Sequence, residues 1–273
     1  MNNLKDWLEI EKSIFSHWRM IFSISKKEFK KEFAGSKLGM AWAIIRPLAM
    51  ITVFWMIFST GMRTTSSNVQ VNYLVWLVSA YIPWIFISDV IMSGAGSIRV
   101  NSFLVKKVKF PVEILPTIRI VISFYTFLIL LVISFIIFAV NGNLNLINIP
   151  KLIYAIIITI IFLAALSRLL STWVVMSIDI LHGISVFMQF LFWMCPVMWQ
   201  AGELPVGASM PWIEKILKLN PLYYLAVLFR DAYLGTHTVG LAYGVYFWVV
   251  TIILFIFGSK VFNKFRPEFD DVL

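Results

Sequence analysis

Residues 115–140 read LPTIRIVISFYTFLILLVISFIIFAV, and this stretch decides the class of fold. It contains one charged residue, Arg119, close to its start. A helix needs about 20 mainly apolar residues to cross roughly 30 Å of hydrocarbon. The stretch therefore predicts a membrane-spanning helix.

The composition of the whole chain agrees with that prediction. Of the 273 residues, 60% are hydrophobic and 14% are charged, whereas a soluble domain has about 25% charged residues. The mean hydropathy is +0.86. The one cysteine, Cys195, excludes a disulfide framework and a cysteine-rich metal site. We expect an all-α integral membrane protein.

Six apolar segments are long enough to be candidate spans. They are residues 40–61, 73–93, 115–140, 152–175, 183–199 and 239–259. The fifth is short and is interrupted by Pro196. The first 38 residues are charged throughout, so we expect no cleavable signal peptide there.

The distribution of Lys and Arg predicts the orientation. Of the 23 basic residues, 18 lie in residues 1–46, in residues 99–119, near the end of the fourth span or after the sixth. Cytoplasmic loops carry an excess of Lys and Arg. We therefore expect a multi-pass protein of the bacterial plasma membrane with both termini in the cytoplasm. The net charge of +9 then reflects topology, and no nucleic-acid partner is expected.

Residues 1–38 form a predicted N-terminal element that precedes the six-span domain, residues 39–273. Its apolar side chains fall on one helical stripe: Leu4, Trp7, Leu8, Phe15, Trp18 and Phe22. Such a helix lies in the membrane interface or packs on the protein's own cytoplasmic surface. Tryptophan is enriched at the headgroup level, which favours the interface.

Two connections between spans are unusual. Residues 94–114 contain a short basic amphipathic helix over 102–111, closed by Pro111, which would dock a cytoplasmic partner or lie on anionic lipid. Residues 200–238 hold apolar runs that are too short to span and are broken by prolines. We expect these runs to lie in the outer interface or to re-enter the membrane, because irregular backbone at that depth must be buried in protein or line a wet cavity.

The sequence offers no catalytic centre. It has no GxxxxGK[ST] phosphate loop and no GxSxG motif, and its three histidines are far apart. Charges at membrane depth are few. We expect Asp89 with Arg119, and Arg168 with Asp179, to form ion pairs at the inner rim; snorkelling of each arginine to the interface is the alternative. The energy source is expected outside the chain.

Several segments resemble a known family. They are Gly39-Met-Ala-Trp42 with Arg46-Pro47, the run from Val105 to Pro116, Ile216-Leu-Lys-Leu-Asn-Pro-Leu-Tyr-Tyr224 with Phe229-Arg-Asp231, and the run from Phe262 to Phe269. From about residue 20 to the C-terminus the chain resembles the membrane subunit of type-2 ABC exporters of lipid-linked polysaccharides. It is most similar to wall teichoic acid export permeases.

The resemblance implies a pore made of two copies of this chain, with two separate ATPase subunits that bind ATP and Mg²⁺; no cofactor is expected in the chain itself. It makes residues 97–110 the helix that couples the permease to the ATPase, with contacts from Ser102, Phe103, Leu104, Val105 and Lys106. It makes residues 200–235 the outer re-entrant helices, with a motif of Asn220, Pro221, Tyr223 and Tyr224.

The implied cargo is an undecaprenyl-diphosphate-linked glycopolymer. Its diphosphate is expected at basic residues near the cytoplasmic leaflet, with Arg46 first and Lys37 and Arg119 as further candidates. The candidates for pore-lining aromatics are Trp42, Phe54, Phe58, Phe187, Phe190 and Trp193. The chain departs from the family at Ile178-Asp179, where an Arg-Asp pair is usual; Arg168 is the candidate substitute for the missing arginine.

The predicted function is thus ATP-driven export of wall teichoic acid. The closest alternative is the same machinery for O-antigen or capsular polysaccharide. A drug-type ABC permease is disfavoured by the long outer segment and the coupling segment. A membrane enzyme acting on polyprenyl phosphates would need a carboxylate or metal centre, and the sequence shows none.

Overall fold

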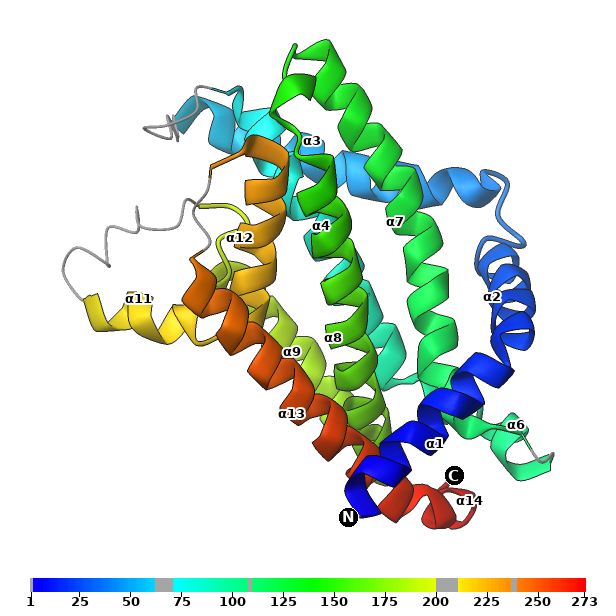
Figure 1. Cartoon of the computed structure of the whole chain (residues 1–273). Coiled ribbons are helices and arrows are strands. Elements are labelled where there is room, and N and C mark those ends of the chain that lie inside the picture. Colours follow the sequence, from blue (N-terminus) through cyan, green and yellow to red (C-terminus); the bar gives the residue numbers. More distant parts are fainter. Residues whose placement is uncertain (1, 62–70, 108–109, 200–210, 237–239) are drawn as a thin grey trace.

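The computed structural model describes residues 2–61, 71–107, 110–199, 211–236 and 240–273, and within these ranges it contains helices and turns but no strand (Figure 1). The α-helices are α1 (Asn2–Ser16), α2 (Trp18–Glu32), α3 (Trp42–Gly61), α4 (Tyr73–Ala95), α5 (Ser97–Val100), α6 (Ser102–Lys107), α7 (Leu115–Val140), α8 (Ile149–Met176), α9 (Asp179–Met194), α11 (Pro211–Lys218), α12 (Pro221–Leu234), α13 (Leu241–Phe265) and α14 (Phe269–Val272). Short 3-10 turns η1 (Gly39–Ala41), η2 (Val112–Ile114), η3 (Leu144–Leu146) and η4 (Arg266–Glu268) join some of them.

Five of the described helices are long and apolar enough to cross a membrane: α3, α4, α7, α8 and α13. They coincide with five of the six predicted segments. The remaining segment, 183–199, was placed wrongly, because α9 starts at Asp179 and ends at Met194 after 16 residues. Cys195 has extended backbone (ψ 145°), as expected of a residue that precedes a proline. The count of six spans stays a prediction.

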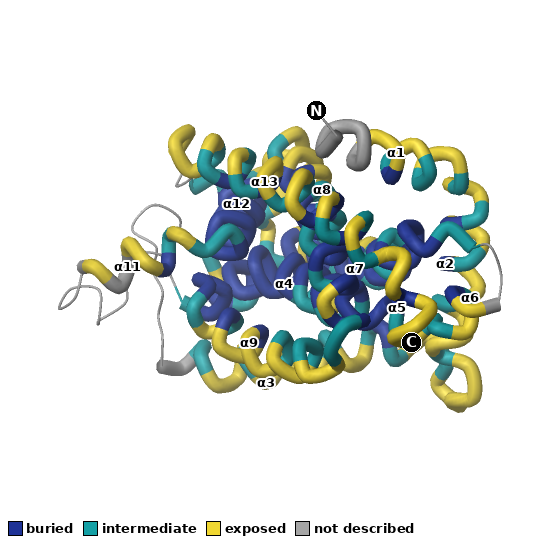
Figure 2. The backbone as a smooth tube through the Cα atoms, turned by 90° about the horizontal axis from the view of Figure 1, so that it is seen from below, coloured by how far each residue is buried: buried dark blue, intermediate teal, exposed yellow. Residues whose placement is uncertain are grey.

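Helix α4 lies at the centre of the molecule, as Figure 2 shows. It contacts α3, α7, α8, α9 and α12. Apolar residues surround its axis, and a helix of that kind is buried on all sides. A Cβ added at Gly94 would lie 2.6 Å from Ser167 Oγ of α8, so glycine is what allows these two helices to approach closely.

Both termini and the coupling segment gather at one end of the molecule (Figure 1). A second apolar cluster holds them together. Its buried members come from α1, α2, α5, α6, η2, α7, α8, α13 and α14 and include Ile10, Ile98, Val105, Phe262 and Phe269. The connection between α7 and α8 lies at the opposite end. Both termini therefore lie at the same end, and their orientation in a membrane stays a prediction.

The N-terminal helices use two different faces. Ile10 of α1 and Ile21 of α2 are buried against the rest of the protein. The predicted apolar stripe is instead exposed, at Leu8, Phe15, Trp18 and Phe22; the side chains of Leu4 and Trp7 lie outside the described residues. The helices therefore pack on the protein through one face and leave a second, apolar face open, so the two predicted placements are compatible.

Candidate functional site

The predicted coupling segment forms two short helices, α5 and α6, with residues 108–109 outside the described part of the chain. Arg99 Nη1 of α5 donates hydrogen bonds of 3.2 Å to the carbonyls of both Val174 and Val175. These carbonyls lie in the last turn of α8, where helix carbonyls lack intrahelical donors. The coupling segment is therefore tied directly to the end of a long apolar helix.

The five predicted coupling residues do not share one environment. Phe103 is 58% exposed, and Lys106 is exposed as well. Val105, in contrast, is 8% exposed and belongs to the second apolar cluster, while Ser102 and Leu104 are half-buried. Val100, which the sequence did not single out, is 67% exposed. We call Val100, Phe103 and Lys106 the coupling surface.

A cavity of about 370 Å³ lies beside the start of α3. Its walls come from α2, α3, α4, α7 and the residue after α2: Glu32, Phe33, Trp42, Ala43, Arg46, Pro47, Ile85, Ser88, Asp89, Met92 and Thr126. Arg46 lies 5.5 Å from the centre of the Trp42 ring. Of the three residues predicted to meet a diphosphate, Arg46 alone is among those walls. Lys37 is exposed in the preceding turn, and Arg119 pairs with Glu28 at 3.8 Å.

Two carboxylates share this cavity with Arg46, and the sequence prediction missed that combination. Partial burial raises the pKa of Glu32, and the nearby Asp89 raises it further, while Arg119 and Arg46 act to lower it. No ion pair joins Asp89 to Arg119 among the described residues, so that predicted pair was wrong. The cavity thus combines both signs of charge, and an anion inside it would meet two carboxylates as well as Arg46.

Arg168 has neither of the two environments predicted for it, an ion pair with Asp179 or a position at the interface. It is 3% exposed, with Nη2 2.7 Å from Glu11 Oε1 and Nη1 2.9 Å from Ser259 Oγ. It therefore neither snorkels to the interface nor pairs with Asp179, which instead contacts Ser177.

Glu113, just after the coupling segment, also links α1 to another part of the protein. Its carboxylate accepts a 2.6 Å hydrogen bond from Ser13 Oγ of α1 and lies 3.1 Å from Arg266. Buried carboxylates are costly unless they are paired and hydrogen-bonded. Glu113 thus fastens α1 and the C-terminal turn to the segment that leads out of the coupling helices.

The predicted pore aromatics fall into two groups. Phe54 and Phe58 are half-buried in ring contacts, with Phe54 5.9 Å from Phe192 and Phe58 6.4 Å from Tyr73. Trp42 is half-buried at the Arg46 cavity. The other three, Phe187, Phe190 and Trp193, are 58–62% exposed and follow one another every three residues along α9. Their role in a pore stays a prediction.

The outer motif starts a buried helix. Asn220 Oδ1 accepts a 3.0 Å hydrogen bond from the Leu222 N–H, and Pro221 follows in the first turn of α12. A proline fits there because the first N–H groups of a helix have no intrahelical acceptor. Tyr223 is buried near Trp199, and Tyr224 stacks on Phe247 at 4.7 Å. Residues 200–210 of this predicted segment lie outside the described residues.

Charged residues fix α12 in place. Arg230 donates to the carbonyls of Pro196 (2.6 Å) and Val197 (3.0 Å), and its guanidinium lies 3.8 Å from the centre of the Trp76 ring. Asp231 pairs with Lys151, at the start of α8, at 2.5 Å. An adjacent Arg and Asp inside an apolar run was a signal for such a role, because charges at membrane depth need partners.

Comparison with known proteins identifies relatives over nearly the whole length. Residues 19–234 match the family model described as ABC-2 type transporter. An O-antigen export system permease protein RfbA from Klebsiella pneumoniae is 25% identical over 259 residues, which cover 93% of this chain and 95% of the relative. An RfbA from Myxococcus xanthus is 22% identical over 262 residues, which cover 96% and 98%.

The family model spans well over half of the chain, including the coupling segment, the Arg46 cavity and α12. Together with the long apolar helices, this match identifies an integral membrane protein. The chain belongs to the ABC-2 type transporter family.

Proposed function

We propose that this chain is the permease subunit of an ATP-driven exporter that moves a lipid-linked polysaccharide of the O-antigen class across the plasma membrane. The observation that carries the proposal is the end-to-end match to permeases named for O-antigen export. Because the matches cover at least 93% of both chains, the outer segment and the coupling segment are included in the similarity.

Wall teichoic acid, the cargo first predicted, has no such support, since the named relatives are O-antigen permeases. Both cargoes would be carried on a polyprenyl diphosphate, so the same permease architecture serves either one. The O-antigen class is therefore the preferred cargo, and teichoic acid becomes an arm of the test.

The ATPase is proposed to bind the coupling surface. Phe103 is an exposed aromatic ring flanked by exposed Val100 and Lys106, and exposed aromatics are frequent anchors at protein interfaces. Arg99 would pass a movement of this surface to α8 through its two carbonyl contacts. Two permease copies with two ATPase subunits, which bind the ATP and Mg²⁺, complete the proposed machine.

The lipid diphosphate is proposed to meet Arg46 in the wall of its cavity. A guanidinium can donate two parallel hydrogen bonds to phosphate oxygens, and Arg46 is exposed enough to do so. Glu32 and Asp89 belong to the same walls as Arg46 and would repel an anion there, which would weaken the contact and allow release. The exposed rings of α9 would offer apolar stacking surfaces to the sugars once a second copy closes the pore.

Deletion of the gene in its own host tests the proposal. We expect loss of the surface polysaccharide and accumulation of its lipid-linked form inside the cell, with both effects reversed by the wild-type gene but not by Phe103→Asp. Chemical analysis of the accumulated polymer distinguishes O-antigen from teichoic acid. Unchanged surface polysaccharide of both kinds would contradict the proposal.

A further inference from the structure

A second cavity, of about 570 Å³, lies between α1 and α13. Its walls are Leu8, Glu11, Lys12 and Phe15 of α1, Ile161 of α8, and Trp248, Thr251, Ile252, Phe255 and Ile256 of α13. Ligand pockets have volumes of about 300–1,000 Å³, so the space suits part of an organic molecule. All but three of its walls are apolar or aromatic side chains.

The cavity lies beside α13, one of the helices long and apolar enough to cross a membrane, and beside α1 at the end where both termini lie (Figure 1). Its α13 residues belong to the part of this helix that leads to η4 and α14 at that end. Ile252 is 53% exposed and Phe15 is 76% exposed, so the walls remain open to the surroundings. In a membrane, such a space next to a spanning helix is reached by acyl chains.

The charged residues at the cavity favour anionic over neutral lipids. Glu11 is neutralised by Arg168 at 2.7 Å. Lys12 is exposed, and no described acidic residue pairs with it. The cavity rim therefore carries one uncompensated positive charge. The cytoplasmic leaflet is the anionic one, and a Lys near its surface contributes about 1 kcal/mol to lipid attraction.

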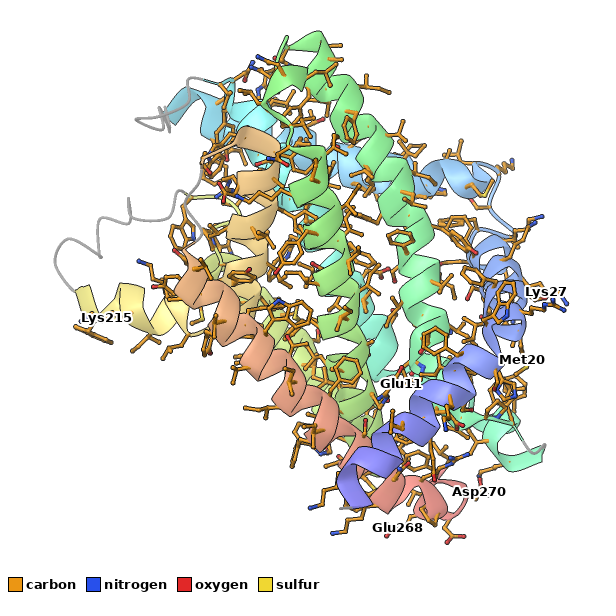
Figure 3. The ribbon with its side chains drawn as sticks, in the orientation of Figure 1. Glu11, Met20, Lys27, Lys215, Glu268 and Asp270 are labelled. Carbon is orange, nitrogen blue, oxygen red and sulfur yellow. The ribbon has the colours of Figure 1, made fainter. Side chains whose placement is uncertain are left out.

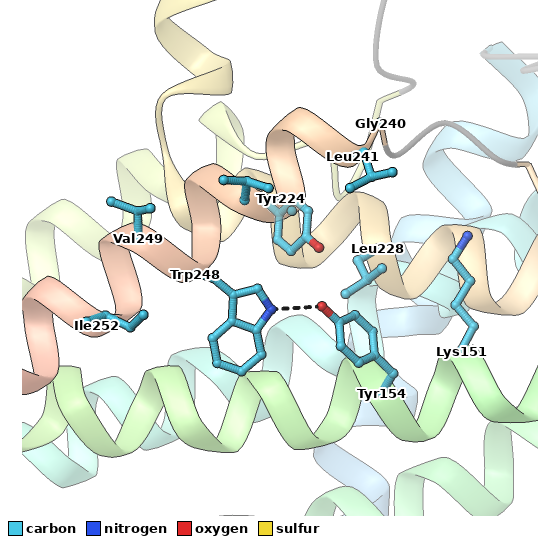
Figure 4. A pocket seen from close by; sticks show the side chains of 11 residues that line it. Lys151, Tyr154, Tyr224, Leu228, Gly240, Leu241, Trp248, Val249 and Ile252 are labelled. Carbon is cyan, nitrogen blue, oxygen red and sulfur yellow. Dashed lines mark hydrogen bonds between the residues drawn. The ribbon is translucent and has the colours of Figure 1, made fainter.

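A neighbouring cavity of about 540 Å³ provides an internal comparison. It lies toward the other end of α13 and shares Trp248 and Ile252 with the first cavity (Figure 4). Trp248 is held there by a 3.0 Å hydrogen bond to Tyr154. The one cationic residue of its walls, Lys151, is already paired with Asp231. This second cavity therefore lacks the free positive charge that would select an anionic headgroup.

We infer that the cavity between α1 and α13 binds one acyl chain of an anionic membrane phospholipid, with the lipid phosphate at Lys12. The bound lipid fills the gap that α1 leaves when Glu11 and Ser13 hold it to the protein. The packing of α1 against the rest of the protein would then depend on the lipid composition of the inner leaflet.

The test uses the permease–ATPase complex in nanodiscs that contain phosphatidylglycerol with a diazirine in its acyl chain. Cross-links should map to residues 8–15 and 248–256. Ile256→Trp fills the cavity and should remove most of the label, whereas Ile253→Trp, at an exposed position of the same helix outside the cavity walls, should not. Lys12→Gln should lower labelling about fivefold. Lys27→Gln, on α2 and pointing away from the bundle (Figure 3), should leave it unchanged.

Three results would overturn the inference. If residues all around α13 are labelled equally and Ile256→Trp does not change the labelling, the probe has reported ordinary annular lipid. If a phosphatidylcholine probe labels as strongly as phosphatidylglycerol, or if Lys12→Gln has no effect, the cavity does not select an anionic headgroup. Competition by undecaprenyl phosphate but not by phosphatidylglycerol would assign the cavity to the cargo lipid. If Ile256→Trp does not assemble, the two lysine variants still decide the question.

Discussion

Glu11 of α1 and Arg168 of α8 form an ion pair of 2.7 Å, although 157 residues separate them in the sequence. Figure 3 shows Glu11 reaching from α1 into the bundle. Because Arg168 is 3% exposed, its charge depends on this partner. The amphipathic N-terminal helix is therefore held by a specific polar contact in addition to its apolar face.

Removal of the Glu11 carboxylate should leave the buried guanidinium of Arg168 without its ion-pair partner. Breaking a buried pair costs about 3–5 kcal/mol; since Glu11 is itself partly exposed, we expect Glu11→Gln to lower the free energy of unfolding by about 2–3 kcal/mol. Thermal unfolding of the purified permease measures the loss, and Glu9→Gln, exposed on the same helix, is the control. If the double variant Glu11→Gln/Arg168→Gln loses the full sum of the two single losses, the pair makes no stabilising contribution.

Two substitutions in α6 should have different consequences. Phe103→Asp changes an exposed ring and should leave the permease stable while lowering ATPase affinity about tenfold or more, as expected for an aromatic anchor. Val105→Asp buries a charge in an apolar cluster and should reduce the yield of folded permease. Co-purification of the ATPase, normalised to folded permease, separates the effects. Normal ATPase binding by Phe103→Asp would remove α6 from the interface.

Cysteine labelling tests the orientation. Cys195 is buried, so it gives little background. Asn145→Cys, in the exposed connection between α7 and α8, should react with an impermeant thiol reagent in intact cells. Asp271→Cys, exposed near the C-terminus, should react only after permeabilisation. The reverse pattern would place both termini outside and exclude the proposed ATPase contact.

Two substitutions of Arg46 test whether its guanidinium binds the diphosphate of the cargo. Arg46→Ala should lower the apparent affinity for lipid-linked cargo about tenfold, within the range for hydrogen bonds to charged groups. Arg46→Lys should retain part of it, because an ammonium cannot form the paired contact. Lys37→Ala, exposed and outside the cavity walls, is the control. Full export by Arg46→Ala at normal complex levels would move the diphosphate site elsewhere.

Hydrophobic length was sufficient to locate most of the long helices. Residues 115–140 form α7 with the predicted bounds, because so long an apolar run has one stable backbone arrangement in lipid. The fifth segment failed since its end depends on one local restriction, the extended backbone before Pro196. Charge type indicated that Arg168 needs a partner. It did not indicate which one, because Glu11 comes from a helix whose docking is a tertiary event.

The coupling segment was found from its basic, amphipathic composition, but its exposed face was not. In such short helices, which residues are buried depends on contacts with α14 and the second apolar cluster, and no periodic pattern records those contacts. The two carboxylates beside Arg46 were missed for the same reason, since they come from two other helices.

The most direct test of the account is transport in proteoliposomes that contain the permease and its ATPase. Lipid-linked O-antigen, labelled in its sugars and presented on the ATPase side, should move across the bilayer only with hydrolysable ATP and should become protected from an added glycosidase. Phe103→Asp should abolish this protection. Complexes that hydrolyse ATP but leave all lipid-linked polysaccharide accessible would contradict the claim that this chain is the export permease.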